Sequence, residues 1–596
     1  MPWSDRRQYA LDWCWFLVCA IASSVWCVSA SSQLSATFDE PVYLTQGLEG
    51  WRTGSHSGLI RLGTMPLPVD VDTLPVFLWE RWRAAPFDVA ADFEQILPVA
   101  RLGTLVFWWG LLFYGWRAAR LLAGPWGGRL AVVWLASEPN LLAHASLATT
   151  DIAISACLLA FCYYFASGRE GAWRKRVALP GFWCGVALLA KASALVFVPL
   201  CMLVIELDRL ARNGTLRSLL SHPADDPSGF AGRAAALFHR LRIGSLEFRR
   251  EALQTMAIGF VVMMVYCGSD WRPEPSFVAW AHKLPAGAPH DAMVWISEHL
   301  RIFSNGAEGI VRQIKHNMKG HHGAYLLGET HARSVWYYFP LALAIKLSLP
   351  LLLAPPALLI ARRRQALNWA CLAAFALLAF SVSYKVQIGI RLVLPLIVML
   401  IVGAAAALAE GATQASGDWR RRLVAGGAAL AAAWTVVVAA SVWPHGLCYT
   451  NELWGDPSQG YLYLSDSNYD WGQGLKELKR WQRTQGLEHL DVWYFGADPT
   501  VNSEPLRNLP LHQLPLGRPQ DVPAFVQGNY VAVGATLLYG TTTLHPQHQK
   551  AVEYFRGRRP VARTTTFLIF DVDRPSVAVR SPRPVQRQAA RLRSGS

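Results

Sequence analysis

Two adjacent carboxylates, Asp39 and Glu40, follow shortly after the first long apolar segment of the chain, Leu11–Ala30. Ionised acids are rarely buried without a partner, so such a pair is expected where a chain leaving a bilayer first meets water. A carboxylate in that place can deprotonate a hydroxyl group that lies within hydrogen-bond reach. The alternative is a solvated acidic pair past a helix end, and position alone does not exclude it.

Further ionisable residues lie at the ends of apolar segments on the same predicted side of the membrane. A charge at such depth costs a few kcal/mol, so it usually faces a polar cavity or a partner. Any one of them alone could be a snorkelling anchor. The set comprises Arg101, His144, Asp151, Lys191, His321, His322, Glu329, Lys346, Lys385 and Arg391. Because fixed cations stabilise a departing phosphate best in a water-poor site, this set predicts sugar transfer from a lipid phosphate to a hydroxyl.

The composition indicates a polytopic membrane protein. Of 596 residues, 53% are hydrophobic, and the mean hydropathy is +0.22, which is too apolar for a soluble chain. The 26 Trp and 18 Tyr fit many membrane–water interfaces. The net charge is +15, but the basic residues fall between apolar segments, so no nucleic-acid partner is expected. No Cys-x-x-Cys occurs, so neither a disulfide framework nor a thiolate zinc site is predicted.

The elements that must position these side chains are apolar segments, about eleven of which come close to the length needed to cross a bilayer. They are Leu11–Ala30, Val99–Arg120, Leu130–His144, Ile152–Ala166, Val177–Ala190, Ser193–Leu207, Leu253–Gly268, Tyr338–Ile360, Leu367–Ser383, Leu392–Ala409 and Leu423–Trp443. The strong basic clusters, such as Arg174–Arg176 and Arg420–Arg422, all fall in connections on one predicted side of the membrane. The positive-inside rule therefore predicts a cytoplasmic N-terminus and an extracytoplasmic C-terminus.

We expect a transmembrane domain over residues 1–443 with outer loops at 31–98 and 269–337, an extracytoplasmic α/β domain over 444–575, and a basic disordered tail over 576–596. In the α/β domain, Leu475–Gln485 is predicted as an amphipathic helix, and Leu490–Phe495 and Tyr530–Leu538 as strands. Val294–Phe303 and Glu308–Met318 are predicted as helices on the membrane surface. The Asp466–Gln473 stretch is either a helix N-cap or a contact to acceptor or sugar.

Short motifs in a fixed order resemble a known family. They are Phe38-Asp39-Glu40, Glu138-Pro139-Asn140 on to Asp151, Leu188–Ala194 around Lys191, Tyr325–Glu329, Tyr337–Pro340 with Lys346, Gly389-Ile390-Arg391 and Asp466–Gln473. Over residues 11–500 the chain resembles membrane glycosyltransferases of the GT-C fold, nearest to the protein-mannosyltransferase and aminoarabinose-transferase-like group, glycosyltransferase family 39. Many relatives carry His-Pro-Pro-Leu after the first acid, whereas this chain has Thr64-Met65-Pro66-Leu67-Pro68. That difference leaves the packing of the first loop and the acceptor open.

The resemblance implies a mostly α, polytopic GT-C fold and inverting transfer from a polyprenyl-phosphate sugar. Asp39 would be the general base, with Glu40 as its supporting neighbour and Asp151 as the second acidic position. The donor phosphate would be held by Lys191, Arg391, Lys346, His322, His321 and Arg101, and the same site would include His144, Glu329 and Tyr325. No cofactor is expected beyond the donor. A divalent metal on the Asp-Glu pair is possible in this fold class but is not favoured, because cations are plentiful.

The expected partners are the bilayer, the polyprenyl-phosphate sugar and a hydroxyl acceptor, which is a glycan, a glycolipid or a protein. The expected location is the bacterial inner membrane. A second hypothesis is a transporter or flippase of a lipid-linked glycan, in which the same charges line a path. Transporters often show internal repeats, and this sequence shows none. A third is a non-catalytic scaffold that keeps the fold.

Overall fold

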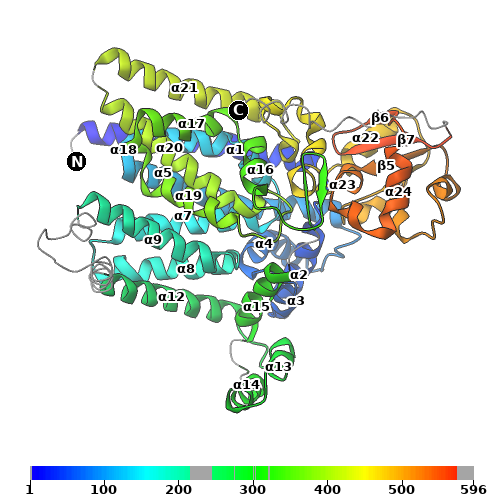
Figure 1. Ribbon diagram of the computed structural model, residues 1–596, viewed down its shortest axis with the longest axis horizontal. Coiled ribbons are helices and arrows are strands. Elements are labelled where there is room, and N and C mark those ends of the chain that lie inside the picture. The colour runs from blue at the N-terminus through cyan, green and yellow to red at the C-terminus, as the bar shows by residue number, and fades with distance from the viewer. Residues whose placement is uncertain are drawn as a thin grey trace, which may run out of the picture.

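Helices carry most of the chain, because a backbone inside a bilayer satisfies its own N–H and C=O groups as a helix. The computed structural model describes residues 3–214, 245–273, 275–299, 301, 304–319, 323–415 and 417–573. Long helices run side by side in a bundle, and a small mixed sheet lies at one end of it (Figure 1). This agrees with the predicted mostly α architecture with a small C-terminal α/β part. The predicted tail over 576–596 lies outside the described residues.

The helices of the first half are α1 (Trp3–Gln33), α2 (Glu40–Thr53), α3 (Ser57–Arg61), α4 (Pro66–Arg83), α5 (Phe93–Ser137), α6 (Pro139–Ala145), α7 (Thr150–Gly168), α8 (Leu179–Ala190), α9 (Ala194–Arg212) and α12 (Leu246–Cys267). Those of the second half are α13 (Pro275–Ala281), α14 (Ala288–His299), α15 (Ser304–Lys319), α16 (Tyr338–Lys346), α17 (Leu349–Ala361), α18 (Arg363–Ala366), α19 (Trp369–Ser381), α20 (Leu394–Thr413), α21 (Asp418–Ser441), α22 (Leu475–Thr484), α23 (Ala535–Leu538) and α24 (Pro546–Arg556).

Six helices of the described part are long and apolar enough to cross a membrane, and the pair α16–α17 would make a seventh. The chain is therefore a multi-pass membrane protein, but the predicted count of about eleven spans is not confirmed. Two predicted spans correspond to the short helices α8, of 12 residues, and α19, of 13 residues. Val99–Arg120 lies within α5, and Leu130–His144 runs from the end of α5 into α6. The 45 residues of α5 are interrupted by non-helical dihedral angles at Ala123 and Gly124, next to Pro125.

The predicted span Tyr338–Ile360 is broken in the middle. The axes of α16 and α17 differ by 115° across Leu347–Ser348. The carbonyl groups freed at the break are satisfied from outside, because Asn451 Nδ2 donates to Ala344 O at 2.7 Å and to Leu347 O at 2.9 Å. A helix end buried in a membrane protein needs such partners. The break turns the end of α16 toward the C-terminal part of the chain.

The bundle is organised around α5, which packs against α1, α7 and α20. The helices α8 and α12 approach each other closely through small residues. A Cβ added at Gly185 would lie 2.5 Å from Val262 Cβ, and one added at Gly259 would lie 2.5 Å from Cys184 Sγ. Small residues at such contacts are typical of helix pairs in membranes, where association depends on van der Waals packing.

The sheet at the end of the bundle has the strand order β4-β3-β5-β7-β6. Its strands are β3 (Leu490–Trp493), β4 (Leu506–Asn508), β5 (Tyr530–Gly534), β6 (Ala562–Arg563) and β7 (Phe567–Asp571). β3 is parallel to both β4 and β5, whereas β7 is antiparallel to β5 and β6. The predicted helix Leu475–Gln485 is α22 and the first predicted strand is β3. The second strand prediction is correct only over β5, because the chain turns into α23 at Ala535.

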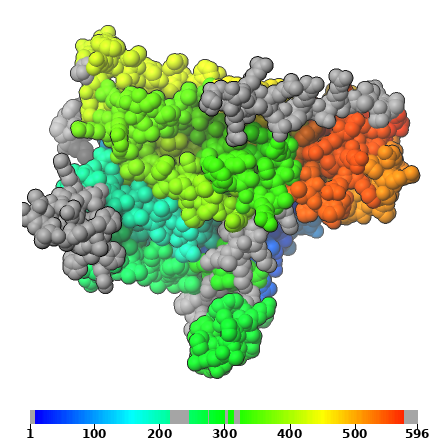
Figure 2. Space-filling view, in the orientation of Figure 1, coloured from blue at the N-terminus to red at the C-terminus, as the bar shows by residue number. Residues whose placement is uncertain are grey.

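The two segments predicted as outer loops, 31–98 and 269–337, are largely helical where they are described and lie at the same end of the bundle as the sheet (Figure 1). The first contains α2, α3 and α4. The second contains α13, α14, α15 and a two-stranded hairpin of β1 (Ala324–Leu326) and β2 (Glu329–His331). The predicted surface helices correspond to α14 and α15. In the space-filling view, α13 and α14 form a lobe that projects away from the body of the molecule (Figure 2).

Candidate active site

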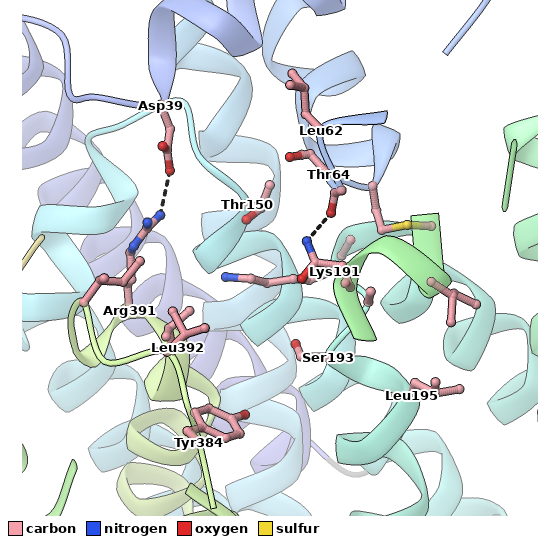
Figure 3. Close-up of a pocket in the computed structure, with 18 of the residues that line it drawn as sticks. Asp39, Leu62, Thr64, Thr150, Lys191, Ser193, Leu195, Tyr384, Arg391 and Leu392 are labelled. Atoms are coloured by element: carbon pink, nitrogen blue, oxygen red, sulfur yellow. Dashed lines mark hydrogen bonds and ion pairs between the residues drawn. The ribbon is translucent and has the colours of Figure 1, made fainter. Parts of the chain in front are cut away.

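Asp39 and Arg391 meet at the end of the bundle that carries the sheet, although 352 residues separate them in sequence. Arg391 Nη1 donates to Asp39 Oδ2 at 2.8 Å. Asp39 directly precedes α2 and its side chain makes no capping bond to that helix, so the carboxylate is free to point at the guanidinium (Figure 3). Arg391 lies in the short turn Ile390–Val393 before α20, and its guanidinium lies 4.2 Å from the centre of the Trp471 ring.

A second acid and a second cation continue this arrangement. Lys191 Nζ donates to Asp151 Oδ1 at 2.6 Å, and Arg391 Nη1 lies 3.9 Å from Asp151 Oδ2. Arg391 therefore stands between the two carboxylates. Asp151 is fully buried, whereas the Asp39 side chain is 22% exposed. The two acids and two cations balance in charge, which is what makes burial of such groups tolerable.

Asp39, Lys191 and Arg391 border a cavity of about 700 Å³, whereas Asp151 lies buried behind them. Its polar wall includes Asp39, Tyr43, Thr64, Lys191 and Arg391. Its apolar wall is formed by Leu195, Val196, Ile310, Phe380 and Leu392. The volume lies within the range of small-molecule sites in proteins. The cavity thus offers both charged and apolar side chains to one ligand.

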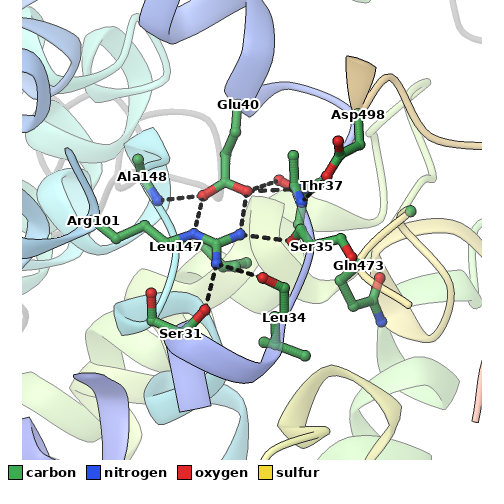
Figure 4. Close-up of polar contacts among 12 residues, drawn as sticks. Ser31, Leu34, Ser35, Thr37, Glu40, Arg101, Leu147, Ala148, Gln473 and Asp498 are labelled. Atoms are coloured by element: carbon green, nitrogen blue, oxygen red, sulfur yellow. Dashed lines mark hydrogen bonds and ion pairs between the residues drawn. The ribbon is translucent and has the colours of Figure 1, made fainter. Parts of the chain in front are cut away.

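Glu40 differs from its neighbour, because it points away from the cavity and is fully buried beside Arg101 (Figure 4). Arg101 Nε and Nη2 each donate to the Glu40 carboxylate at 2.7 Å. The remaining N–H groups of Arg101 donate to Ser31 O, Leu34 O and Ser35 O. Arg101 was expected at the donor phosphate. All five of its N–H groups donate to acceptors within the protein, so none is left for a phosphate. We therefore assign Arg101 a structural role in positioning the site residues.

The Glu40–Arg101 pair joins the segments that lead to the two site acids. Glu40 accepts hydrogen bonds from Thr37 N and Ala148 N, both at 2.8 Å. The first group precedes Asp39 and the second precedes Asp151. Burial would raise the pKa of Glu40, but the Arg101 charge and these hydrogen bonds hold it below its usual value. Glu40 is therefore an ionised structural group.

A buried carboxyl that the sequence analysis missed, Asp72, supports the same loop. Its Oδ1 lies 2.9 Å from Thr104 Oγ1, and that hydroxyl lies 2.8 Å from Leu147 O. Burial raises the pKa of Asp72 well above its usual value. The Thr104 hydroxyl, within hydrogen-bond distance of both groups, connects Asp72 to Leu147 in the segment before Asp151. Nothing in the sequence around Asp72 distinguishes it from a solvated acid.

Three other predicted site residues do not reach the cavity. Lys346 is buried and donates from Nζ to Leu447 O at 2.7 Å and to Asn468 O at 2.9 Å. Tyr325 is buried in β1 and its hydroxyl donates to Leu462 O at 3.3 Å. Glu329 is exposed in β2.

Of the remaining predictions, His144 lies beside the site, with Nδ1 3.9 Å from Asp151 Oδ2. His321 and His322 lie outside the described residues. Tyr43 was missed, although its spacing of four residues from Asp39 places it on the same side of α2. Burial and the carboxylates of Asp39 and Asp151 raise the pKa of Tyr43, so its hydroxyl stays neutral.

The stretch Asp466–Gln473 holds both charged partners in place from the side of the sheet. Phe38 N donates to Trp471 O at 2.9 Å, which fixes the residue before Asp39. Ile390 N donates to Asn468 Oδ1 at 2.9 Å, which fixes the residue before Arg391. The N-cap alternative is wrong, because α22 begins at Leu475 with Gly474 as its cap. Among the described residues, no group of three or more His, Cys, Asp or Glu side chains could hold a metal ion.

Residues 92–220 match the family model described as dolichyl-phosphate-mannose-protein mannosyltransferase. No curated protein matches the chain. Among solved structures, the chain is similar to ArnT from Cupriavidus metallidurans bound to undecaprenyl phosphate, at 14% identity and a TM-score of 0.46, covering 95% of this chain and 99% of that one. It is also similar to the archaeal oligosaccharyltransferase AglB from Archaeoglobus fulgidus in complex with an inhibitory peptide and a dolichol-phosphate, at 11% identity and a TM-score of 0.40, covering 94% and 75%.

The matched segment 92–220 runs from the start of α5 past the end of α9. It includes Asp151 and Lys191, two of the four charged residues that are linked by ion pairs beside the cavity, and Arg101. The resemblance predicted from the short motifs is therefore supported over the part of the chain that holds half of the candidate site. The chain is similar to the protein-mannosyltransferases, which are membrane glycosyltransferases, and this similarity rests on residues 92–220.

Proposed function

We propose that the protein is an inverting glycosyltransferase that moves a sugar from a polyprenyl-phosphate donor to a hydroxyl acceptor at the outer face of the membrane. The observation that carries this proposal is the Asp39–Arg391 pair at a cavity that apolar side chains also line. A phosphate diester needs cations, and a polyprenyl chain needs an apolar surface. The family model over residues 92–220 supports a donor of this class.

In this proposal, Lys191 and Arg391 bind the donor phosphate. The phosphate leaves with one more negative charge than it carries in the donor, so cations fixed beside it stabilise the transition state more than the ground state. Asp151 does not react. It holds Lys191 Nζ at 2.6 Å and lies 3.9 Å from Arg391 Nη1, which keeps both cations directed at one place.

Asp39 is the proposed general base. When the donor phosphate engages Arg391, the Asp39 carboxylate loses part of its ion pair and becomes free to accept a proton. The acceptor oxygen forms a bond to the anomeric carbon while the bond from that carbon to the phosphate oxygen breaks. The acceptor proton passes to Asp39 and the polyprenyl phosphate leaves with the bonding electrons. A single displacement of this kind inverts the anomeric centre.

The direct test measures release of free polyprenyl phosphate by the full chain in lipid nanodiscs, with a panel of polyprenyl-phosphate sugars and a crude envelope acceptor. Asp39→Asn should lower release by about 100-fold or more, the effect expected for loss of a general base. Glu49→Gln is the matched control, because Glu49 is an exposed acid on the same helix α2, and it should leave release unchanged.

Other outcomes separate the alternatives. Wild-type release that Asp39→Asn does not lower would retain the transferase and exclude Asp39 as its base. Movement of intact lipid-linked sugar across the bilayer without any release would favour the transporter. The anomeric configuration of the product, determined by nuclear magnetic resonance, tests inversion.

A further inference from the structure

The second outer loop contains an arm that the proposed reaction does not use. The arm comprises residues 269–301 and its two helices, α13 and α14, pack mainly against each other. Ala281 and Ser297, which are fully buried, lie in the arm. His282 directly follows α13 and Glu298 lies in the last turn of α14, and His282 Nε2 is 3.0 Å from Glu298 Oε1. The arm is therefore a paired unit of its own.

The base of the arm is closed and fixed to the bundle. Ser269 Oγ donates to Arg301 O, so the two ends of the arm meet. Asn305 Nδ2 donates to Cys267 O at 3.3 Å. Ser55 Oγ, from the first outer loop, donates to Asp270 Oδ1 at 3.0 Å. These bonds hold the arm at the end of α12 at a defined height relative to the bundle.

The direction of the arm follows from this attachment. The bundle helices run along one direction, and the arm leaves the end of α12 roughly across that direction, at the end of the bundle that carries the sheet (Figure 1). It projects away from the body as a separate lobe (Figure 2). A segment in this place runs parallel to a membrane plane, at the height where spanning helices leave the hydrocarbon.

The side chains of the arm suit that height. Trp271, Trp280 and Trp295 are 66%, 42% and 63% exposed, and Trp rings prefer the headgroup layer. The outer half of α12 also exposes Val261 and Val265, so the aromatic side chains continue the apolar surface of a spanning helix. Residues 269–301 contain four Asp or Glu and three Lys or Arg, which gives no strong attraction to anionic lipid.

We propose that the arm lies in the headgroup layer of the leaflet on the side of the sheet, and that its partner is the lipid surface. The attachment depends on insertion of aromatic side chains and is independent of lipid charge. The arm continues into α15, whose Ile310 borders the cavity. Attachment of the arm to lipid therefore also holds one wall of the cavity against the bundle.

The experiment uses the full chain in nanodiscs that contain a phospholipid with a diazirine placed either close to the glycerol or at the end of the acyl chain. Crosslinked peptides are mapped by mass spectrometry. We expect the glycerol-proximal probe to label residues 271–299 and the acyl-end probe to label them much less, whereas α12 is labelled by both. Replacing half of the neutral lipid with anionic lipid should leave the labelling of the arm unchanged.

The double variant Trp280→Ala/Trp295→Ala should lower arm labelling by at least about threefold, because interfacial attachment scales with buried apolar area. Trp82→Ala is the matched control, since Trp82 is 84% exposed on α4, and unchanged labelling of α12 shows that the variants are folded. An arm labelled no more than the solvent-facing helix α24 would overturn the proposal. Crosslinks that place the arm against another part of the chain or another protein would also overturn it.

Discussion

Asp39 and Glu40 are neighbours in sequence, but they occupy opposite environments. Asp39 is partly exposed at a cavity and has one ion-pair partner, Arg391, at 2.8 Å. Glu40 is fully buried and accepts hydrogen bonds from Arg101, Thr37 and Ala148. The two side chains point in different directions because α2 begins between them: Asp39 precedes α2 and Glu40 is its first residue.

This difference distinguishes a carboxylate that can act in a reaction from one that stabilises the fold. A carboxylate whose lone pairs are all occupied has no capacity left to accept a proton from a substrate. Asp39 retains that capacity and faces a space large enough for a ligand. Glu40 cannot accept a further proton, but its hydrogen bonds fix the segment before Asp39 relative to the segment before Asp151.

The largest expected effect comes from removing the partner of Glu40. Arg101→Leu leaves an unpaired buried carboxylate, which should destabilise the fold by about 3–5 kcal/mol. Thermal unfolding in detergent, followed by scanning calorimetry, checks this. Arg81→Leu is the control, because Arg81 is exposed on α4 and should change the midpoint little. A folded Arg101→Leu protein with an unchanged midpoint would mean that the pair does not support the structure.

A smaller effect is expected at the cavity itself. Lys191→Met removes one charge-assisted bond to the donor phosphate, which should weaken binding of polyprenyl phosphate by about 10–100-fold. Binding is measured by titration of the nanodisc protein with a short-chain polyprenyl phosphate. Lys385→Met provides the comparison, since Lys385 also lines the cavity but is exposed, and its effect should be several-fold smaller. Equal effects at both positions would show that the cavity attracts the phosphate only by general charge.

The smallest effect concerns Asp466, on the stretch that holds both charged partners. Burial raises the pKa of Asp466 to about 7, and the nearby charge of Arg391 opposes the shift. A carboxyl with a raised pKa binds more protons in the folded state, so its contribution to stability is greatest at low pH and is lost as the pH rises through 7. Asp466→Asn should therefore flatten the fall in unfolding midpoint between pH 5 and pH 8. A wild-type midpoint that does not fall faster than that of the variant would contradict this.

Much of the architecture could be predicted from sequence, because apolar length and the spacing of charged clusters are local properties. The span count could not. The 115° bend after Lys346 redirects an apolar run that looks continuous, and α8 and α19 are only 12 and 13 residues long where full spans were predicted. The helix α22 and the strand β3 were predictable from the period of their apolar residues, whereas the turn into α23 after Gly534 was not.

The candidate site was predictable in part. Asp39, Asp151, Lys191 and Arg391 do meet, and their order in the chain was the signal. Lys346 looked equivalent to Lys191, since both are cations near the predicted outer ends of spans. Only the fold shows that Lys346 donates hydrogen bonds to the carbonyl groups of Leu447 and Asn468. The partners of a buried cation come from distant segments, and no local pattern records them.

The central claim is that Asp39 acts in the reaction and Glu40 acts in the structure. The measurement that tests it most directly compares Asp39→Asn with Glu40→Gln in the same nanodiscs, recording turnover per folded molecule and the unfolding midpoint of each. The account predicts that Asp39→Asn lowers turnover by about 100-fold or more with its midpoint unchanged. It predicts that Glu40→Gln lowers the midpoint while the folded fraction turns over within a few-fold of wild type. A folded Glu40→Gln protein as inactive as Asp39→Asn, or an Asp39→Asn protein that keeps its turnover, would contradict it.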